Sequence, residues 1–204
     1  MRIFTDDADR ELYLSLLAEQ SRLHGVEFLA WCLMTNHVHF VCVPRSEAAL
    51  AGCFGEAHKR YTRRRNSREG ARGWLFQGRF GSYPVQKDSH LIAVARYVEM
   101  NPVKAHLVKE PGDYDWSSAR AHLDGRRRDP LGCDGNLLGL VDDWPGFLAE
   151  GMARGDAREI ERRLSTGRPW GTDEFVQGLE KQLGVNLTPG VGGWPKGRKR
   201  KSGD

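Results

Sequence analysis

Two strand-like runs that follow each other closely constrain the fold of this chain more than any other feature. The first, VEFLAWCLM at residues 26–34, is apolar on both faces, which is typical of a strand covered on both sides. A short Thr-Asn turn leads into the second, HVHFVCV, which Pro44 ends. Side chains of a strand alternate between its faces, so His37 and His39 point to the same side. The pattern predicts a hairpin on which both imidazoles can hold one ion.

Two helices are expected to flank this hairpin in the sequence. The first runs from Asp6 to about His24, because acidic residues favour a helix start and Gly25 is a natural stop. Ser46 is expected to cap the second. The two apolar stripes at helical spacing are Leu12, Leu16 and Leu23, flanked by Tyr13 and Leu17, and Leu50, Phe54, Ala57 and Tyr61. A further strand is expected at about 80–86.

A third helix begins at Asp88 or Ser89 and carries a core stripe of apolar residues. Pro102 disfavours helical geometry at the residue before it, so the helix is expected to end at about Asn101. Tyr97 and Asn101 are four residues apart and therefore lie on one helix face. A phenol, an amide oxygen and two imidazoles that converge would suit phosphoryl transfer, with the tyrosine holding the phosphate as a covalent ester. The core-stripe residues are Leu91, Val94, Ala95 and Val98.

The bland interpretation of each of these residues stays open beside the functional one. His37 and His39 could be satisfied core or hairpin histidines, and Tyr97 could be a half-buried helix aromatic. Asn101 could merely cap a helix before a proline. The conjunction of both motifs in one chain is what favours function.

Basic residues gather at the end of the second helix and in the loop after it. The chain has a formal net charge of +4 and a pI near 9.0, and clustering of basic residues favours an anionic polymer such as nucleic acid as partner. A solvated helix face is the alternative. Tyr61, Trp74 and Phe76 could stack unpaired bases. The candidate DNA-binding residues are Lys59, Arg60, Arg63, Arg64, Arg65, Arg68, Arg72, Gln77 and Arg79.

Composition places the chain in a reducing compartment. Its 4 cysteines lack zinc-site spacing, and those in the strand-like runs are expected to behave as small buried hydrophobes. No apolar run approaches the length of a membrane span. We therefore expect a cytoplasmic protein with no membrane partner.

The chain divides into three expected regions. Residues 1–123 form the main domain, 124–185 a helical accessory region, and 186–204 a Gly-, Pro- and Lys/Arg-rich tail that is expected to be disordered. Short helices are expected near 144–153, 157–164 and 173–183. The basic stretch GRKRK near the end is as compatible with a solubilising terminus as with a DNA clamp.

Three segments resemble the REP-associated tyrosine transposases, members of the HUH single-strand nuclease superfamily with an IS200-like transposase domain. They are WCLMTNHVHFV, WLFQGRFGSYPV and RYVEMNPVKAHLV, and the resemblance runs from about Ile3 to Trp116. It implies an α+β protein with a ferredoxin-like βαββαβ core. It further implies a single-stranded DNA endonuclease and strand transferase that acts at hairpin-forming repeats. Dimers are common in that superfamily, and nothing in this sequence decides the oligomeric state.

The resemblance also implies roles for the candidate site residues. Tyr97 would attack a DNA phosphate to give a 5′-phosphotyrosyl link, while His37, His39 and Asn101 would bind Mg²⁺ or Mn²⁺. No residue stands out as the acceptor of the tyrosine proton.

The sequence departs from the family at its beginning. Members carry a strand before the first helix, whereas only MRIF precedes Thr5 here. A core without its first strand would leave unpaired backbone groups beside the histidine strand. Either the true start lies upstream, or the protein is a catalytically inactive remnant that binds hairpin or single-stranded DNA. A ferredoxin-like RNA-binding domain is a third alternative, but its strands would normally carry stacking aromatics.

Overall fold

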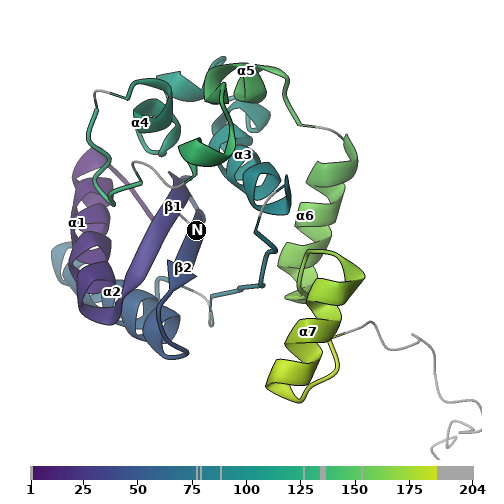
Figure 1. Cartoon of the computed structure of the whole chain (residues 1–204). Coiled ribbons are helices and arrows are strands. Elements are labelled where there is room, and N and C mark those ends of the chain that lie inside the picture. The colour runs from purple at the N-terminus through teal and green to yellow at the C-terminus, as the bar shows by residue number, and fades with distance from the viewer. Residues whose placement is uncertain are drawn as a thin grey trace, which may run out of the picture.

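An antiparallel hairpin lies between helices in the computed structural model, which describes residues 2–76, 78, 80–87, 89–125, 127–133, 137–152 and 154–187 (Figure 1). Strand β1 (Val26–Leu33) pairs with β2 (Val38–Pro44). Helices α1 (Asp7–His24) and α2 (Ala49–Glu69) lie on one side of the hairpin, and α3 (Ser89–Lys104) lies on the other.

The two faces of the hairpin belong to two different cores. Phe28 and Trp31 of β1 pack with α1 and α2, whereas Leu29, Ala30 and Cys32 pack with α3. The register shifts between Phe28 and Ala30, so the alternation of faces changes there. Seven of the eight β1 residues are buried, which confirms the expected strand covered on both sides. In β2, Val38, Phe40 and Cys42 face α1 and α2, and Val41 faces α3.

Helix α1 begins and ends as the sequence predicts. Asp6 caps its first turn by accepting from the Asp9 backbone N–H, and Gly25 ends it in the left-handed conformation at φ 68°. Leu16 and Leu17 are buried, but Leu23 is 70% exposed, so its expected core position was wrong. It lies in the last turn of α1, outside the core that α1 and α2 share.

Helix α2 starts later than expected. Ser46 does not cap it, because the helix begins at Ala49 with Ala48 in the N-cap position and no side-chain cap. The Ser46 carbonyl instead accepts from the Ala49 N–H in a turn before the helix. The expected stripe is confirmed, since Phe54, Ala57 and Tyr61 are buried and Leu50 packs against them.

Helix α3 ends later than expected. It continues through Pro102 to Lys104, so the predicted end at Asn101 was wrong. Pro102 lacks an N–H, yet the turn closes because the Ala105 N–H bonds the Asn101 carbonyl and the Leu107 N–H bonds the Pro102 carbonyl. The expected stripe of α3 packs in the second core, with Val94, Ala95 and Val98 buried.

The strand expected at 80–86 is absent from the described part of that segment, and no described residue before α1 forms a strand. Val85 makes an isolated bridge with Trp170, and the Gln86 N–H donates to the Trp170 carbonyl at 2.8 Å. A strand needs a neighbour in a sheet, and the described residues offer this segment only Trp170. The described chain is thus α+β with a two-stranded sheet, and the four-stranded ferredoxin-like core was not found.

The described residues after α3 form short helices joined by loops. Expected helices near 144–153, 157–164 and 173–183 correspond to α5 (Trp144–Ala149), α6 (Arg154–Thr166) and α7 (Asp173–Leu183). No described helix is long and apolar enough to cross a membrane. The remaining elements are η1 (Pro111–Asp113), α4 (Ala119–Leu123) and η2 (Leu138–Leu140). Most of the expected tail, residues 188–204, lies outside the described residues.

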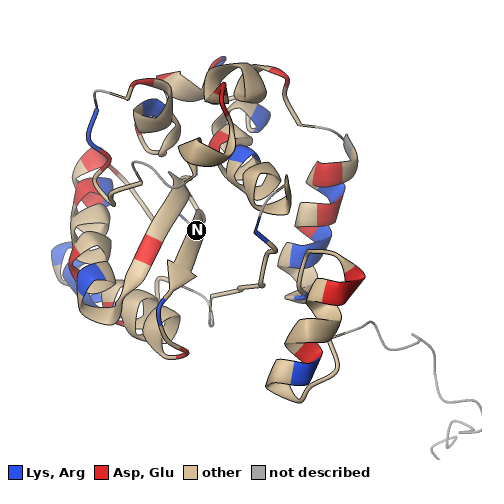
Figure 2. Cartoon of the chain, in the orientation of Figure 1, with Lys and Arg blue, Asp and Glu red and all other residues tan. Residues whose placement is uncertain are grey.

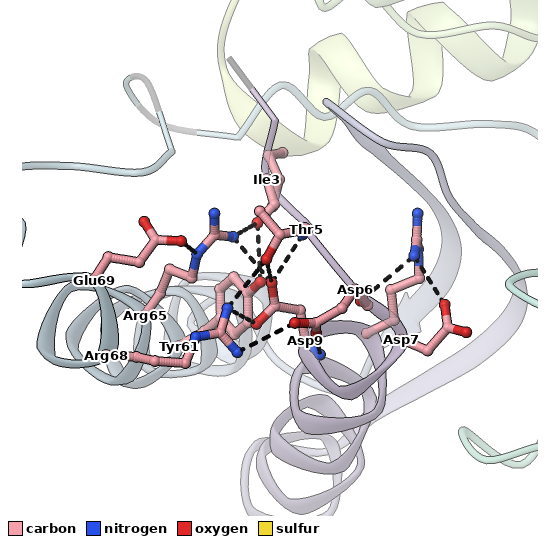
Figure 3. Close-up of polar contacts among 10 residues, drawn as sticks. Ile3, Thr5, Asp6, Asp7, Asp9, Tyr61, Arg65, Arg68 and Glu69 are labelled. Carbon is pink, nitrogen blue, oxygen red and sulfur yellow. Dashed lines mark hydrogen bonds and ion pairs between the residues drawn. The ribbon is translucent and has the colours of Figure 1, made fainter.

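A buried carboxylate ties the start of the chain to α1 and α2 (Figure 3). Asp9 accepts hydrogen bonds from the Thr5 backbone N–H and hydroxyl at 2.9 and 2.7 Å. It also pairs with Arg65 at 3.1 Å and with Arg68 at 2.7 Å. Arg65 and Tyr61 both donate to the Ile3 carbonyl. The N-terminal segment is therefore anchored on α2, and the Ile3 N–H reaches the Thr35 carbonyl just before β2 at 2.9 Å.

A second buried carboxylate, Glu99, ties α3 to the segments that follow it. Glu99 is 0% exposed and accepts from the Ser118 hydroxyl at 2.6 Å and from the Trp144 indole at 2.9 Å. His122 Nδ1 lies 2.5 Å from the Glu99 carboxylate, and His122 Nε2 lies 2.6 Å from the Cys133 carbonyl. Both partners of the imidazole are acceptors, so both ring nitrogens carry protons. Burial lowers the pKa of His122, but Glu99 and the carbonyl outweigh it and raise that pKa overall.

We predict that Asp9→Asn destabilises the protein by about 3 kcal/mol, the usual cost of breaking a buried ion pair. Burial raises the pKa of Asp9, but Thr5, Arg65 and Arg68 lower it by more than burial raises it. The pKa of Asp9 therefore lies below its usual value. The stabilisation is therefore complete above the unfolded-state pKa of about 3.9 and is lost as pH falls through the folded-state pKa. Urea unfolding between pH 2 and 6 should show an acid-sensitive wild type and a flatter Asp9→Asn profile. Equal slopes for both proteins would contradict this role.

We predict the opposite pH dependence for the Glu99–His122 pair. Because the folded-state pKa of His122 is raised, its contribution is complete below about pH 6.5 and is lost as pH rises through the folded-state value. In Glu99→Gln, the loss of charge should reduce both the stability at pH 6 and its decline towards pH 9. Thermal unfolding of both proteins across that range is the measurement. A Glu99→Gln protein that declines as steeply as wild type would refute the pairing.

Candidate functional site

The two histidines of the HVH motif lie together at the start of β2. Their ring centroids are 4.8 Å apart, and the rings are nearly perpendicular, with an interplanar angle of 84°. His37 is exposed and His39 is half-buried. Asn36 Oδ1 lies 2.8 Å from His37 Nδ1, which orients that ring. The expectation that both imidazoles point to one side is confirmed.

Both imidazoles favour the neutral form that binds metals. Burial lowers the pKa of His37. Burial, His37 and the Lys104 ammonium together lower the pKa of His39 to about 4. At neutral pH each imidazole is therefore neutral and has a nitrogen lone pair available. Divalent ions bind histidine in this neutral form.

Tyr97 reaches the same place from α3. Its ring centroid lies 6.0 Å from that of His39, with the rings nearly perpendicular. The Lys104 ammonium lies 5.2 Å from the centre of the Tyr97 ring and forms an ion pair with Glu161 of α6. Burial raises the pKa of Tyr97, Lys104 lowers it and Glu161 raises it, so that the pKa is raised overall. The phenol is therefore protonated at neutral pH.

Asn101 is buried one turn after Tyr97, and its amide is partly engaged. Its Nδ2 donates to the Tyr97 carbonyl at 2.8 Å. This contact leaves the amide oxygen Oδ1 as the atom that could bind an ion. The described contacts bring His37, His39 and Tyr97 together and do not join Asn101 to either histidine.

His37 and His39 could supply two of the ligands that a divalent ion needs. Two neutral imidazoles two residues apart on one strand face, one of them oriented by an amide, are a typical pair of ligands for Mn²⁺ and related ions. Among the described residues no group of three His, Cys, Asp or Glu side chains gathers for a metal, so an amide or waters would have to complete the shell.

The histidines and Tyr97 line a cleft of about 1180 Å³ that runs along β2. Every residue of β2 contributes to its wall, and Phe80, Tyr83 and Lys87 line it as well. The walls are largely apolar. The β2 edge that faces away from β1 has no strand beside it in the described residues.

The structure sorts the basic run of α2 into engaged and free side chains. Arg65 is only 6% exposed and is held by Asp9, Glu69 and Ile3, which argues against its expected DNA contact. Arg68 pairs with Asp9. Lys59 pairs with Glu56 at 3.0 Å and Arg60 with Glu19 at 2.6 Å.

Three of the candidate DNA-binding residues have no such partner. Arg63, Arg64 and Arg72 are exposed, and no ion pair joins them to another described residue. Figure 2 shows Lys and Arg segments where α1 and α2 lie side by side, interspersed with acidic ones. Gln77 and Arg79 lie outside the described residues.

Sequence reasoning missed several residues that shape this site. Glu99 is four residues after Ala95, and an acid at such a core-stripe position is a signal for a buried polar partner. Lys104 is two helical turns after Tyr97, so its proximity was also readable from spacing. Asn36 gave no signal, because it lies in the short turn between the two strand-like runs, and Tyr83 lies in a segment that was expected to be a strand.

Comparison with known proteins places the chain in a family. The model of the family "Transposase IS200 like" matches residues 1–101, which contain the hairpin, α2 and the Tyr97 turn of α3. No curated protein and no solved structure matches the chain. The matched segment ends at Asn101 and so includes all four residues of the candidate site. The chain belongs to the family of IS200-like transposases.

Proposed function

We propose that this transposase is a metal-dependent single-stranded DNA endonuclease and strand transferase that acts at hairpin-forming repeats, as REP-associated members do. The observation that carries the proposal is the convergence of His37, His39 and Tyr97 on the wall of one cleft. These residues come from segments about 60 positions apart in the sequence. Membership of the transposase family supports DNA as the substrate.

In the proposed reaction the Tyr97 hydroxyl attacks a backbone phosphorus atom. A bond forms between the phenolic oxygen and phosphorus, and the bond from phosphorus to the 3′ oxygen breaks. The products are a 5′-phosphotyrosyl link and a free 3′-OH, which takes a proton. Attack by another 3′-OH reverses the step and joins strands. The energy of the phosphodiester is kept in the tyrosyl ester, so joining needs no ATP.

Lys104 supports the role of Tyr97. A cation 5.2 Å from the ring centre favours the negative phenolate over the neutral phenol. Its influence opposes burial, which keeps the phenol protonated. Because its partner Glu161 belongs to α6, the accessory helices help to position the ammonium.

His37 and His39 would hold the divalent ion, Mg²⁺ or Mn²⁺, with Asn101 Oδ1 as third ligand. When bound, such an ion supplies Lewis-acid stabilisation of charge on the phosphate oxygens. The side chains themselves contribute two neutral nitrogens beside the attacking phenol. Asn36 holds the His37 ring in place.

A DNA-binding remnant without catalysis is the rival proposal. The observation in its favour is the uncovered β2 edge together with the missing strand at 80–86. It predicts binding of hairpin or single-stranded DNA without a covalent product.

We predict that Tyr97→Phe abolishes a covalent protein–DNA adduct. The wild-type protein is incubated with labelled single-stranded hairpin oligonucleotides and Mn²⁺ or Mg²⁺, and denaturing gels detect the adduct. Tyr83→Phe is the matched control, because it removes another phenol from the same cleft. Adduct in wild type and Tyr83→Phe but not in Tyr97→Phe supports the proposal. Binding with no adduct in any protein supports the remnant.

We predict that His39→Ala weakens Mn²⁺ binding more than about 10-fold, since even loss of an outer-shell partner costs 10- to 100-fold. Calorimetric titration of the purified protein measures this directly. His106→Asn is the control, because His106 is exposed and its positive φ of 56° suits asparagine. Asn101→Ala tests the third ligand. Unchanged Mn²⁺ affinity in His39→Ala would remove the histidines from the metal site.

A further inference from the structure

A shallow basic groove lies at the C-terminal end of α2, apart from the Tyr97 cleft. It has a volume of about 640 Å³ and shares no lining residue with that cleft. No carboxylate lines it. The lining residues are Arg60, Arg63, Arg64, Asn66, Ser67, Ala71, Arg72 and Gly73, and we call this set the basic groove.

The arginines of the basic groove are placed to bind phosphates. Arg63 and Arg64 follow Arg60 by three and four residues, so they occupy neighbouring positions on α2. Arg60 is engaged with Glu19, whereas Arg63, Arg64 and Arg72 are exposed without an ion pair to the described residues. An exposed guanidinium that keeps its donors available can bind phosphate oxygens in a bidentate manner.

A locked loop carries an exposed indole directly after the last residue that lines the basic groove. Asn66 Nδ2 donates to the Gly73 carbonyl at 2.8 Å, and the Asn66 carbonyl accepts from the Ala71 N–H at 3.0 Å. Gly70 and Gly73 have φ values of 62° and 112°, which other residues rarely adopt. Trp74 follows directly and is 84% exposed, more than any other large hydrophobic side chain in the described residues.

Trp74 also joins the two sites along the chain. Gly73 lines the basic groove, and Leu75 and Phe76 line the Tyr97 cleft. In the sequence, Trp74 therefore lies between a residue that lines the basic groove and two residues that line the cleft. An exposed indole can stack an unpaired base but not one that is already stacked in a duplex.

We propose that the basic groove is a second DNA-binding site, which holds a single strand through phosphate contacts from Arg63, Arg64 and Arg72 and stacks one unpaired base on Trp74. The proposal rests on the function proposed above and adds the site that holds the strand outside the cleft. Its chemistry selects single-stranded over duplex DNA.

The test measures binding without cleavage. Tyr97→Phe protein in EDTA is titrated with a fluorescent 15-nucleotide oligo-dT and with a blunt duplex of equal length, at several salt concentrations. Trp74→Ala should weaken oligo-dT binding roughly 5- to 100-fold, as loss of a stacked base does, while Trp74→Phe retains most of the affinity. Duplex binding should be much less sensitive to Trp74→Ala.

A charge-matched pair of triple variants isolates the arginines. Arg63→Ala/Arg64→Ala/Arg72→Ala should reduce the slope of log affinity against log salt by about 2, since each phosphate contact on a single strand contributes about 0.7. Arg22→Ala/Arg45→Ala/Arg128→Ala removes the same charge from exposed arginines outside the basic groove and should leave the slope nearly unchanged. If both triple variants lower the salt slope equally, the arginines of the basic groove act only through the general positive charge of the protein. That result would overturn the proposal.

The remaining outcomes separate this proposal from the proposed function. Unchanged oligo-dT affinity in Trp74→Ala, or an equal loss for the duplex, overturns the groove whether or not wild type forms the Tyr97 adduct. Groove-dependent binding by a protein that forms no adduct overturns the Tyr97 chemistry and supports the groove.

Discussion

The buried Glu99 carboxylate is the interaction on which the candidate site depends. Its bonds to Ser118, His122 and Trp144 fix the rotation of α3 about its own axis. Tyr97 lies two residues earlier, about 200° around the helix, so anchoring Glu99 towards the 118–144 segments directs Tyr97 towards β2. The 6.0 Å approach of Tyr97 to His39 thus follows from a carboxylate that takes no part in the proposed chemistry.

Asp9 is the corresponding buried carboxylate on the other side of the hairpin. Its ion pairs determine which arginines of α2 are engaged within the protein. Arg65 and Arg68 turn inward to it, because a carboxylate that is only 2% exposed requires compensating charge. The same run of sequence therefore supplies both a structural ion-pair cluster and a basic groove. Arg64 is exposed to solvent, whereas Arg65, the next residue, is buried. One residue corresponds to about 100° of rotation around the helix, which is enough to turn a side chain from solvent to core.

Much of the fold could be predicted because its signals are local. The two faces of β1, the alternation of β2, the Gly25 stop and the stripes of α2 and α3 all follow from periodicity within single segments. The failures share a cause, which is that they depended on partners elsewhere. The expected strand at 80–86 had no sheet neighbour, the Ser46 carbonyl formed a turn before α2, and α3 continued beyond Pro102 because the next turn closed.

By itself, the sequence determined that His37 and His39 share a strand face, that Tyr97 and Asn101 share a helix face, and that the chain resembles tyrosine transposases. Short-range geometry settles such matters, since side-chain direction repeats with the period of the element. Only the tertiary structure decided that His39 lies beside the Tyr97 ring, that the Asn101 amide nitrogen bonds the Tyr97 carbonyl, and that Arg63, Arg64 and Arg72 remain exposed. Those outcomes depend on buried carboxylates and helix packing, which join residues far apart in the chain through contacts that no local pattern encodes.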